Sequence, residues 1–251
     1  MDVIEAIGTR ISCRAFSDRR LSEETFDELR ARIDNLNEES GLDFQLYGPE
    51  EDGFVISMNK AMFANDPPAY AALVGPDDPL SKEMLGFYGE DFVLYATQLG
   101  LGTCWVASTY DKETTRVELS DGESLHDVVP IGYAPDRMPL KQRMIRTTIR
   151  KKSKRPAKLF EGPMPLDEAP EWIQAAIDGV CAAPSAINSQ PIVFTWEGGE
   201  SPVRANIRDE RTRLQFTDLG IAKCHFGIVA KACGMEGSWE WGDGGAYVTS
   251  P

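Results

Sequence analysis

The chain has 251 residues, of which 42% are hydrophobic and 26% are charged, and its formal net charge is −14. This composition is typical of a globular protein with a buried core. A surface this acidic repels phosphate backbones, so it argues against nucleic-acid binding. No apolar run is long enough to span a bilayer, and the acidic N-terminus lacks the apolar region of a signal peptide. We therefore expect a cytoplasmic protein without a membrane partner.

The chain has five cysteines, which form no C-x-x-C pair, and only two histidines. An odd number of scattered cysteines favours neither a disulfide framework nor a thiolate zinc site. Such cysteines usually pack as small hydrophobic residues. We expect no metal.

Helices and strands alternate in the first part of the chain. Ser22 caps an expected helix over residues 22–37, with Phe26, Leu29, Ile33 and Leu36 on one face. A second helix is expected over residues 84–99, with Gly100 near its C-terminal end. Strands are expected around Phe44 and Leu46 and over residues 70–74, 104–107 and 128–133.

The same plan recurs further along. A helix is expected over residues 171–182, and strands over residues 192–196 and 203–207. A helix capped by Asp218 and ending near Ala232 follows, and a last strand holds Trp239 and Trp241.

This order predicts an α+β fold that is internally duplicated. One half would span residues 1–157 and the other residues 170–251, joined by a Pro-rich connection at residues 158–169. No G-x-G-x-x-G follows a strand, so a Rossmann unit has no support.

Four segments have residue types that suit a flavin nucleotide. Arg10, Ser12 and Arg14 offer two guanidinium groups and a hydroxyl for a phosphate. Taken alone, such a segment is more typical of a surface loop with solvated arginines. The basic stretch of residues 141–158 is either a solvated face or an anion site.

The other two segments could bring backbone and amide groups to a planar ring. Residues 182–191 read A-A-P-S-A-I-N-S-Q-P, and the amides of Asn188 and Gln190 can match the donors and acceptors of a heterocycle. Residues 99–105 read L-G-L-G-T-C-W, with glycines that let backbone N–H groups face a ligand. Each segment is also common as an ordinary helix end or connection.

Together, these segments resemble the FMN-dependent nitroreductase family. The family's R-x-S-x-[RK]-x-F segment is matched from Arg10 to Phe16, and its L-G-L-G-[ST]-x-W segment from Leu99 to Trp105. Its A-P-S-x-x-N-x-Q-P segment is matched by Pro184, Ser185, Asn188, Gln190 and Pro191. A basic segment of the family resembles Lys152 to Pro156.

The resemblance implies roles for individual residues. Arg10, Ser12, Lys152 and Lys154 would hold the FMN phosphate, and Arg14 would lie near the N1 edge of the flavin. Backbone N–H groups at Ala107 or Ser108 would face N5. Residues of the A-P-S segment would reach the flavin from the second half: Pro184, Ser185, Asn188 and Gln190. No catalytic side chain is required, because the flavin carries the chemistry.

One departure from the family is informative. In ordinary members the A-P-S segment follows soon after the first segment, and FMN lies between two subunits. Here it appears only in the second half. The resemblance is to a branch in which one chain imitates the dimer, so we expect a monomer with one intact FMN site.

The implied reaction is a ping-pong cycle in which NADH or NADPH reduces FMN and an oxidised aromatic is then reduced. The acceptor would be a nitroaromatic, a quinone or a similar small molecule. Two alternatives remain open. The chain could be a flavin-binding or flavin-delivery protein without turnover, or it could run another reaction, such as dehalogenation or enoate reduction, on the same scaffold.

Overall fold

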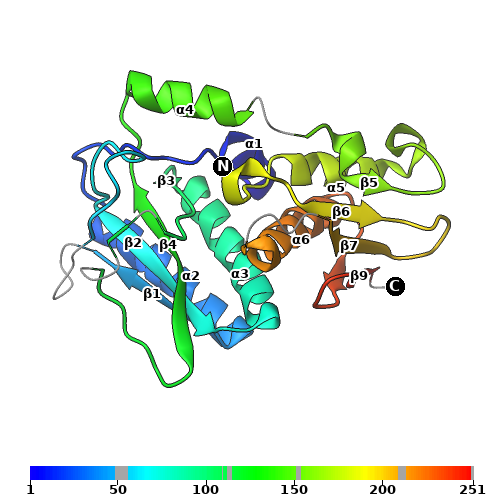
Figure 1. The fold of residues 1–251 in the computed structure, drawn as a ribbon, viewed down its shortest axis with the longest axis horizontal. Coiled ribbons are helices and arrows are strands. Elements are labelled where there is room, and N and C mark those ends of the chain that lie inside the picture. Colours follow the sequence, from blue (N-terminus) through cyan, green and yellow to red (C-terminus); the bar gives the residue numbers. More distant parts are fainter. Residues whose placement is uncertain (49–55, 109, 112–114, 151–153, 209–212, 250–251) are drawn as a thin grey trace. The chain divides into compact units, whose positions relative to one another are not determined.

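A computed structural model describes residues 1–48, 56–108, 110–111, 115–150, 154–208 and 213–249. The chain divides into two compact units, each with its own sheet. The first unit holds Met1 and residues 9–77 and 92–148; the second holds residues 2–8, 78–91 and 149–251. Helices and strands are mixed along the chain in an α+β order, as Figure 1 shows.

The first unit is built on a four-stranded antiparallel sheet with the order β1-β2-β4-β3. Its strands are β1 (Asp43–Tyr47), β2 (Ala69–Pro76), β3 (Gly102–Thr103) and β4 (Glu123–Gly132). In β2 every residue except Pro76 is buried, so both faces of this strand are covered. Tyr70 of β2 stacks on Tyr47 of β1, with 5.0 Å between ring centroids.

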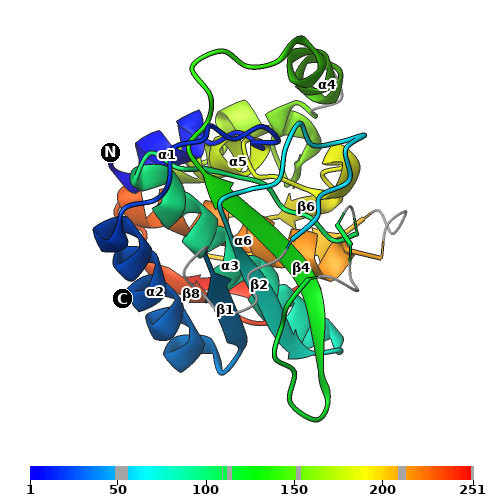
Figure 2. The same ribbon diagram turned by 90° about the vertical axis from the view of Figure 1, so that its left-hand side faces the viewer.

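α2 (Glu23–Ser40) runs beside β1, as Figure 2 shows, and buries Leu29, Ile33 and Leu36. The Ser22 hydroxyl accepts a hydrogen bond from the Thr25 N–H at 3.2 Å, which caps the helix N-terminus. Gly41 ends the helix at a φ of 71°, a left-handed conformation that favours glycine. A serine cap of this kind stabilises a helix by about 1 kcal/mol.

The outer edge of β1 is held by a side chain of α2. The Asn37 amide accepts a hydrogen bond from the Phe44 N–H at 2.8 Å and donates one to the Phe44 carbonyl at 2.9 Å. Because β1 is an edge strand, these two backbone groups face away from β2. Asn37 therefore satisfies groups that would otherwise be open at the sheet edge.

The second unit has a five-stranded sheet with the order β5-β6-β7-β9-β8. Its strands are β5 (Phe160–Glu161), β6 (Ile192–Thr195), β7 (Val203–Ile207), β8 (Gly237–Trp239) and β9 (Ala246–Thr249). All neighbours are antiparallel except β5, which pairs parallel with β6.

Two helices of the second unit, α5 (Glu171–Cys181) and α6 (Gln215–Ala232), pack against each other. α6 also packs against β6, β7 and β8. The core between α6 and the sheet is aromatic: Phe226 stacks on Phe194 at 5.0 Å and meets Trp239 and Tyr247 edge-on. Each such pair contributes roughly 0.5–1.5 kcal/mol beyond the burial of its area.

The remaining helices are α1 (Val3–Thr9), α3 (Pro79–Gln98) and α4 (Leu140–Arg150), with short 3-10 turns at Pro156–Lys158, Leu166–Glu168 and Ala186–Asn188. α3 contributes residues 79–91 to the second unit and residues 92–98 to the first.

The two sheets repeat one plan. β1-β2-β4-β3 and β6-β7-β9-β8 are both fully antiparallel, and one long helix follows the second strand in each. β7 begins after β2, and α6 ends after α3, at the same offset of 134 residues (203 minus 69, and 232 minus 98). Gly100 and Gly234 follow these helices at that offset, with left-handed φ angles of 79° and 83°. The internal duplication expected from the sequence is therefore present in the topology.

Within the second unit, residues 79–91 of α3 approach α6 closely at two glycines. A Cβ on Gly86 would clash with the Thr217 carbonyl, and a Cβ on Gly220 would clash with the Glu83 carbonyl. Glu83 and Thr217 are 134 residues apart, as are Gly86 and Gly220, so the contact is reciprocal. Reciprocity of this kind is what a two-fold symmetric pair of helices produces.

Most of the expected elements are confirmed, with shifted ends. The helix expected at residues 22–37 is α2, which continues to Ser40, and the helix expected at residues 84–99 is α3, which starts five residues earlier. The strands expected at residues 70–74, 128–133 and 192–196 are β2, β4 and β6, and β7 spans residues 203–207 as expected.

Other expectations were wrong. Residues 104–107 form no regular strand, because only Gly102 and Thr103 pair regularly with β4 and Val106 makes a single isolated bridge. Asp218 does not cap α6, which begins at Gln215 and leaves Asp218 inside its first turn. Trp241 lies beyond β8, which ends at Trp239. β9 and the helices α1 and α4 were not expected.

No helix in the described ranges is long and apolar enough to cross a membrane. Among the same residues, no group of three or more His, Cys, Asp or Glu side chains could hold a metal ion.

Candidate functional site

Arg10, Ser12 and Arg14 lie on the connection between α1 and α2, next to the start of β3. Ser12 forms a parallel bridge with Thr103, and the Cys13 N–H donates to the Thr103 carbonyl at 2.7 Å. Only a residue without a Cβ fits beside this contact, since a Cβ on Gly102 would lie 2.7 Å from the Cβ of Cys13. The glycine of the L-G-L-G segment thus brings the Arg10–Arg14 segment against β3.

The Cys104 thiol shows that the three polar side chains gather at one place. Burial raises the pKa of this thiol, while the Arg14 charge, a hydrogen bond with Ser12 and the Arg10 charge lower the pKa. Both guanidinium groups and the hydroxyl therefore lie close enough to Cys104 to act on it. The structure brings Arg10, Ser12 and Arg14 together.

A further hydroxyl lies beside this cluster. Thr103, which bridges to Ser12, is 1% exposed, and its Oγ1 has no hydrogen-bond partner among the described residues. Buried hydroxyl groups are usually paired, so an orphaned one next to two arginines fits a ligand with acceptor oxygens. Two guanidinium groups and hydroxyls form the donor set that a phosphate needs. The sequence analysis did not single out Thr103.

Ala107 and Ser108 follow the point where pairing with β4 ends. The Val106 N–H donates to the Val128 carbonyl at 3.0 Å, and the Val128 N–H donates back at 2.9 Å. Beyond this bridge, Ala107 is half-buried and Ser108 is exposed. The chain therefore leaves the sheet at the two residues whose N–H groups were expected to face a ligand.

The A-P-S segment forms a strained loop in the second unit. Ile187, Asn188 and Gln190 have φ angles of 49°, 55° and 45°, and they are the non-glycine residues with positive φ in the described part of the chain. A β-branched residue such as Ile187 rarely adopts this conformation. Each such residue costs about 1–3 kcal/mol, and clusters of them are typical of functional loops.

Gln190 holds this loop in place from inside. Its Oε1 accepts from the Lys154 N–H at 2.5 Å, and its Nε2 donates to the Cys181 carbonyl at 3.3 Å. Its own N–H donates to the Ser185 hydroxyl at 3.0 Å. With its side chain buried and its amide engaged, Gln190 acts on the loop as a positioning residue.

Lys154 and Asp218 complete the support of the loop. The Lys154 ammonium donates to the Gln190 carbonyl at 2.6 Å, so this lysine lies against the A-P-S segment. The Asp218 carboxylate accepts from the Ala186 N–H at 2.9 Å. The sequence analysis read Asp218 as a helix cap and missed this role. Lys152 lies outside the described residues.

The expected site residues therefore form two clusters, one in each compact unit. Arg10, Ser12, Arg14, Ala107 and Ser108 belong to the first unit. Lys154, Pro184, Ser185, Asn188 and Gln190 belong to the second. Pro184 and Asn188 are half-buried on the loop, while Ser185 is engaged by Gln190.

A family model described as "Putative TM nitroreductase" matches residues 2–230 of the chain. The chain belongs to this nitroreductase family. None of the curated proteins compared with it matches.

Solved structures of nitroreductases resemble the chain. A "putative nitroreductase" from Thermotoga maritima is 23% identical, with a TM-score of 0.66, over 100% of this chain and 95% of that one. This likeness shows that the chain has the nitroreductase-like fold. A nitroreductase family protein from Clostridium difficile is 18% identical over 59% of this chain and 92% of that one, with a TM-score of 0.39. An "FMN and NADPH-dependent nitroreductase" mutant from a Sphingopyxis strain is 17% identical over 57% of this chain and 92% of that one, with a TM-score of 0.42.

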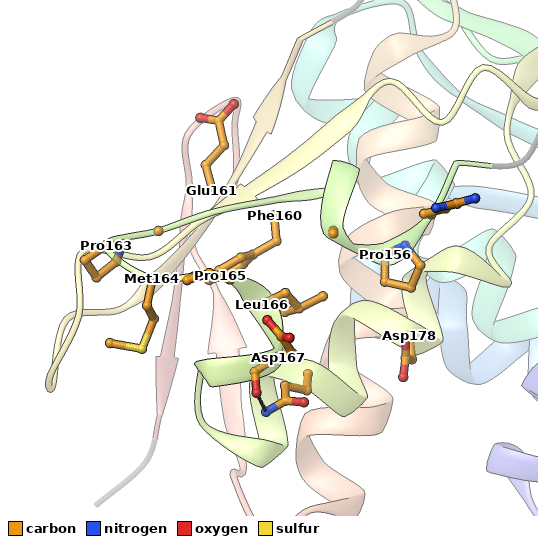
Figure 3. Close-up of a pocket in the computed structure, with 13 residues that line it drawn as sticks. Pro156, Phe160, Glu161, Pro163, Met164, Pro165, Leu166, Asp167 and Asp178 are labelled. Carbon is orange, nitrogen blue, oxygen red and sulfur yellow. Dashed lines mark hydrogen bonds between the residues drawn. The ribbon is translucent and has the colours of Figure 1, made fainter.

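The nitroreductase chain also has an open depression of about 920 Å³ in its second unit, shown in Figure 3. The Pro-rich connection forms much of its wall, through Pro156, Pro163 and Pro165. Asp167 and Asp178 give it an acidic side. It contains none of the residues that match the family segments except Pro156, so it is separate from the candidate site.

Proposed function

We propose that the chain binds one FMN and works as an NAD(P)H-dependent oxidoreductase of the nitroreductase type. The observation that supports this most directly is the convergence of Arg10, Ser12 and Arg14 on the Cys104 thiol, beside the orphaned hydroxyl of Thr103. This donor set fits a flavin phosphate and its polar side chain. Family membership supports the reaction type.

Each cluster has its own part in the proposal. Arg10, Ser12 and Lys154 hold the phosphate, with Lys152 beside Lys154 in the chain. Arg14 provides a fixed cation that stabilises negative charge on the N1 side of the ring. When bound, FMN accepts hydride from NADH or NADPH and passes reducing equivalents to an acceptor.

The ring side of the proposed site is backbone and loop. N–H groups at Ala107 or Ser108 donate to the ring, and the A-P-S loop orients it from the second half through Pro184, Ser185 and Asn188. The strain at Asn188 is maintained by internal hydrogen bonds, so the loop is ordered before a ligand arrives. Preorganised groups of this kind lower the cost of binding.

The second substrate in the proposal is a nitroaromatic, a quinone or a similar oxidised aromatic, reduced in a ping-pong cycle. The repeated topology supports a monomer that contains what other members build from two subunits. Light scattering on a size-exclusion column would measure this mass directly; a stable dimer would contradict it.

The first test is the visible spectrum of the protein after addition of FMN and desalting. We expect retained oxidised-flavin bands at about one flavin per chain. Arg14→Ala removes a charge-assisted hydrogen-bond donor and should weaken FMN binding by roughly 10- to 100-fold. Arg20→Ala, an exposed arginine on the same connection, is the matched control and should bind as the wild type does.

Anaerobic addition of NADH or NADPH then separates the alternatives. An oxidoreductase bleaches its flavin bands, whereas a flavin-binding or flavin-delivery protein stays yellow. A wild-type protein that remains colourless and does not quench FMN fluorescence would refute the proposal.

A further inference from the structure

The second half contains a counterpart of the L-G-L-G-T-C-W segment. Residues 234–239 read G-M-E-G-S-W and follow α6 as residues 100–105, G-L-G-T-C-W, follow α3. Trp105 and Trp239 are 134 residues apart, which is the offset of the repeated strands and helices.

Strand pairing extends this equivalence by one residue. Val106 exchanges backbone hydrogen bonds with Val128 next to β3. Its counterpart, Glu240, donates its N–H to the Ala246 carbonyl at 2.8 Å next to β8. Ala107 and Ser108 of the first half therefore correspond to Trp241 and Gly242 of the second.

The connections that follow differ in length. The first half has residues 107–122 between Val106 and β4, whereas the second half has only residues 241–245 between Glu240 and β9. The short turn folds back on itself, with the Gly245 N–H donating to the Gly242 carbonyl at 3.0 Å.

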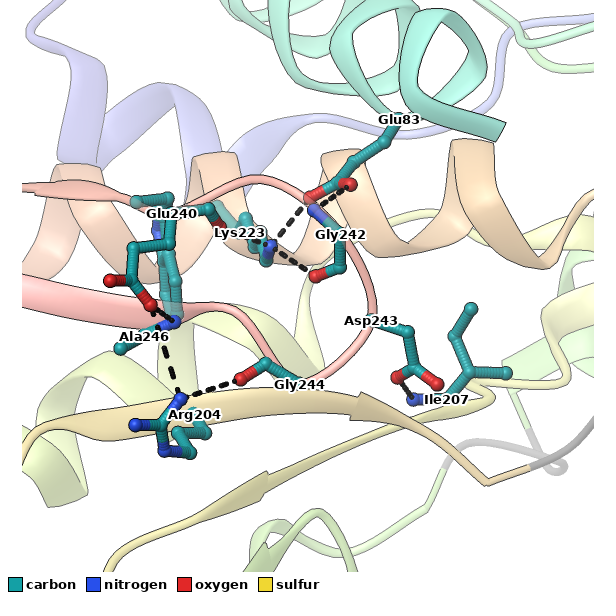
Figure 4. Close-up of polar contacts among 10 residues, drawn as sticks. Glu83, Arg204, Ile207, Lys223, Glu240, Gly242, Asp243, Gly244 and Ala246 are labelled. Carbon is teal, nitrogen blue, oxygen red and sulfur yellow. Dashed lines mark hydrogen bonds and ion pairs between the residues drawn. The ribbon is translucent and has the colours of Figure 1, made fainter. Parts of the chain in front are cut away.

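A buried ion pair occupies the inner side of this short turn, as Figure 4 shows. The Gly242 N–H donates to Glu83 Oε2 at 2.6 Å, and the Lys223 ammonium donates to Glu83 Oε1 at 2.5 Å. The ammonium also donates to the carbonyls of Glu240 at 2.9 Å and Gly242 at 3.0 Å. Glu83 and Lys223 are 0% exposed, and all three ammonium protons have acceptors.

The turn is fastened at its outer side as well. Asp243 accepts a hydrogen bond from the Ile207 N–H at 2.7 Å, and Arg204 donates to the Gly244 carbonyl at 3.0 Å (Figure 4). The turn that corresponds to Ala107 and Ser108 is therefore closed by protein groups on both sides.

The first half also lacks the complementary loop. The A-P-S segment fills the ten-residue connection 182–191 between α5 and β6. Its counterpart between α2 and β1 is only Gly41 and Leu42. Two residues cannot form a loop that reaches a ligand and returns to the sheet.

We propose that the internal repeat has kept one flavin site and closed the other, with the Glu83–Lys223 pair occupying the position from which the second half's backbone would meet a flavin. This inference rests on the proposed function. It assigns Glu83 and Lys223 to closure of the second site and limits each chain to one flavin.

Hydrogen exchange can test the closure directly, with the intact chain and FMN as the probe. FMN should slow exchange in a peptide covering residues 104–108 and leave a peptide covering residues 239–243 unchanged. A fluorescence titration should saturate at one FMN per chain. Slower exchange at residues 239–243 with FMN, or saturation at two per chain, would overturn the inference.

A second comparison needs no flavin. Glu83→Ala removes the charged acceptor of the Gly242 N–H and should speed its exchange by about tenfold or more. Glu90→Ala is the matched control, since Glu90 lies on the same helix and pairs with buried His225 at 2.9 Å. Equal exchange at Gly242 in both variants would show that the pair does not close the turn. A wild-type chain that binds no FMN would refute the proposed function, while this comparison still tests the closure.

Discussion

Replacement of Asp127 by asparagine should make the protein more stable, and increasingly so as the pH rises. Asp127 lies on β4, is 3% exposed, and its Oδ2 has no hydrogen-bond partner among the described residues. Burial raises the pKa of this carboxyl from 3.8 to about 7. Its charge also raises the pKa of the nearby Tyr110 hydroxyl, whose oxygen likewise has no partner in the described structure.

The sign follows from the two protonation states. In the unfolded chain the carboxyl ionises above pH 3.8, whereas in the folded chain it stays protonated up to about pH 7. The folded state therefore binds more protons in this window, and stability falls as the pH rises through it. One pKa unit corresponds to 1.36 kcal/mol, so the full loss above pH 7 is about 4 kcal/mol, of which about 3 kcal/mol falls between pH 5 and pH 8.

Urea unfolding of wild type and Asp127→Asn at pH 5, 6, 7 and 8 measures this difference. Asparagine has nearly the same shape and no charge, so any fixed cost of its amide cancels when the two pH values are compared. We expect the difference in unfolding free energy to grow by about 3 kcal/mol from pH 5 to pH 8. Asp121→Asn, on the exposed turn before β4, should show no such growth. A flat difference for Asp127→Asn would refute the reasoning.

Three further changes test the structure. Gln190→Ala removes the support of the A-P-S loop and should raise the FMN dissociation constant roughly 10- to 100-fold in a fluorescence titration, whereas Gln174→Ala, in the connection, should not. Lys223→Met leaves Glu83 buried without its partner and should cost about 3–5 kcal/mol in urea unfolding; adding Glu83→Leu should recover most of this loss. Ile187→Asn places a residue that tolerates left-handed φ at an exposed strained position, so it should stabilise the fold by about 1 kcal/mol in thermal melts. A lower melting temperature would contradict the strain at this position.

The sequence predicted those elements whose signals are local. The Ser22 cap and the apolar spacing of Leu29, Ile33 and Leu36 are complete within one turn or one face, and α2 formed as expected. β7 lies between a glycine turn and a polar segment, and its bounds were correct for the same reason.

The errors arose where tertiary contacts overrode local preference. Asp218 has the residue type of a helix cap, yet its carboxylate is used by Ala186, which lies far away in sequence. Glu83, Lys223 and Asp127 are charged residues at buried positions, and no periodic pattern distinguishes such residues from exposed ones. The short-range motifs located the candidate site residues, but the role of Gln190 as a loop support depends on contacts with Lys154 and Cys181 that no spacing reveals.

The Asn37 amide that holds both backbone groups of Phe44 also affects how copies of the chain meet. An uncovered edge strand is a template for strand addition by another molecule, and such addition leads to cross-β aggregation. In the second sheet β5 covers the corresponding edge of β6, whereas in the first sheet a single side chain does so. Asn37 is therefore constrained by solubility rather than by catalysis, and its loss would lower the concentration at which the protein aggregates.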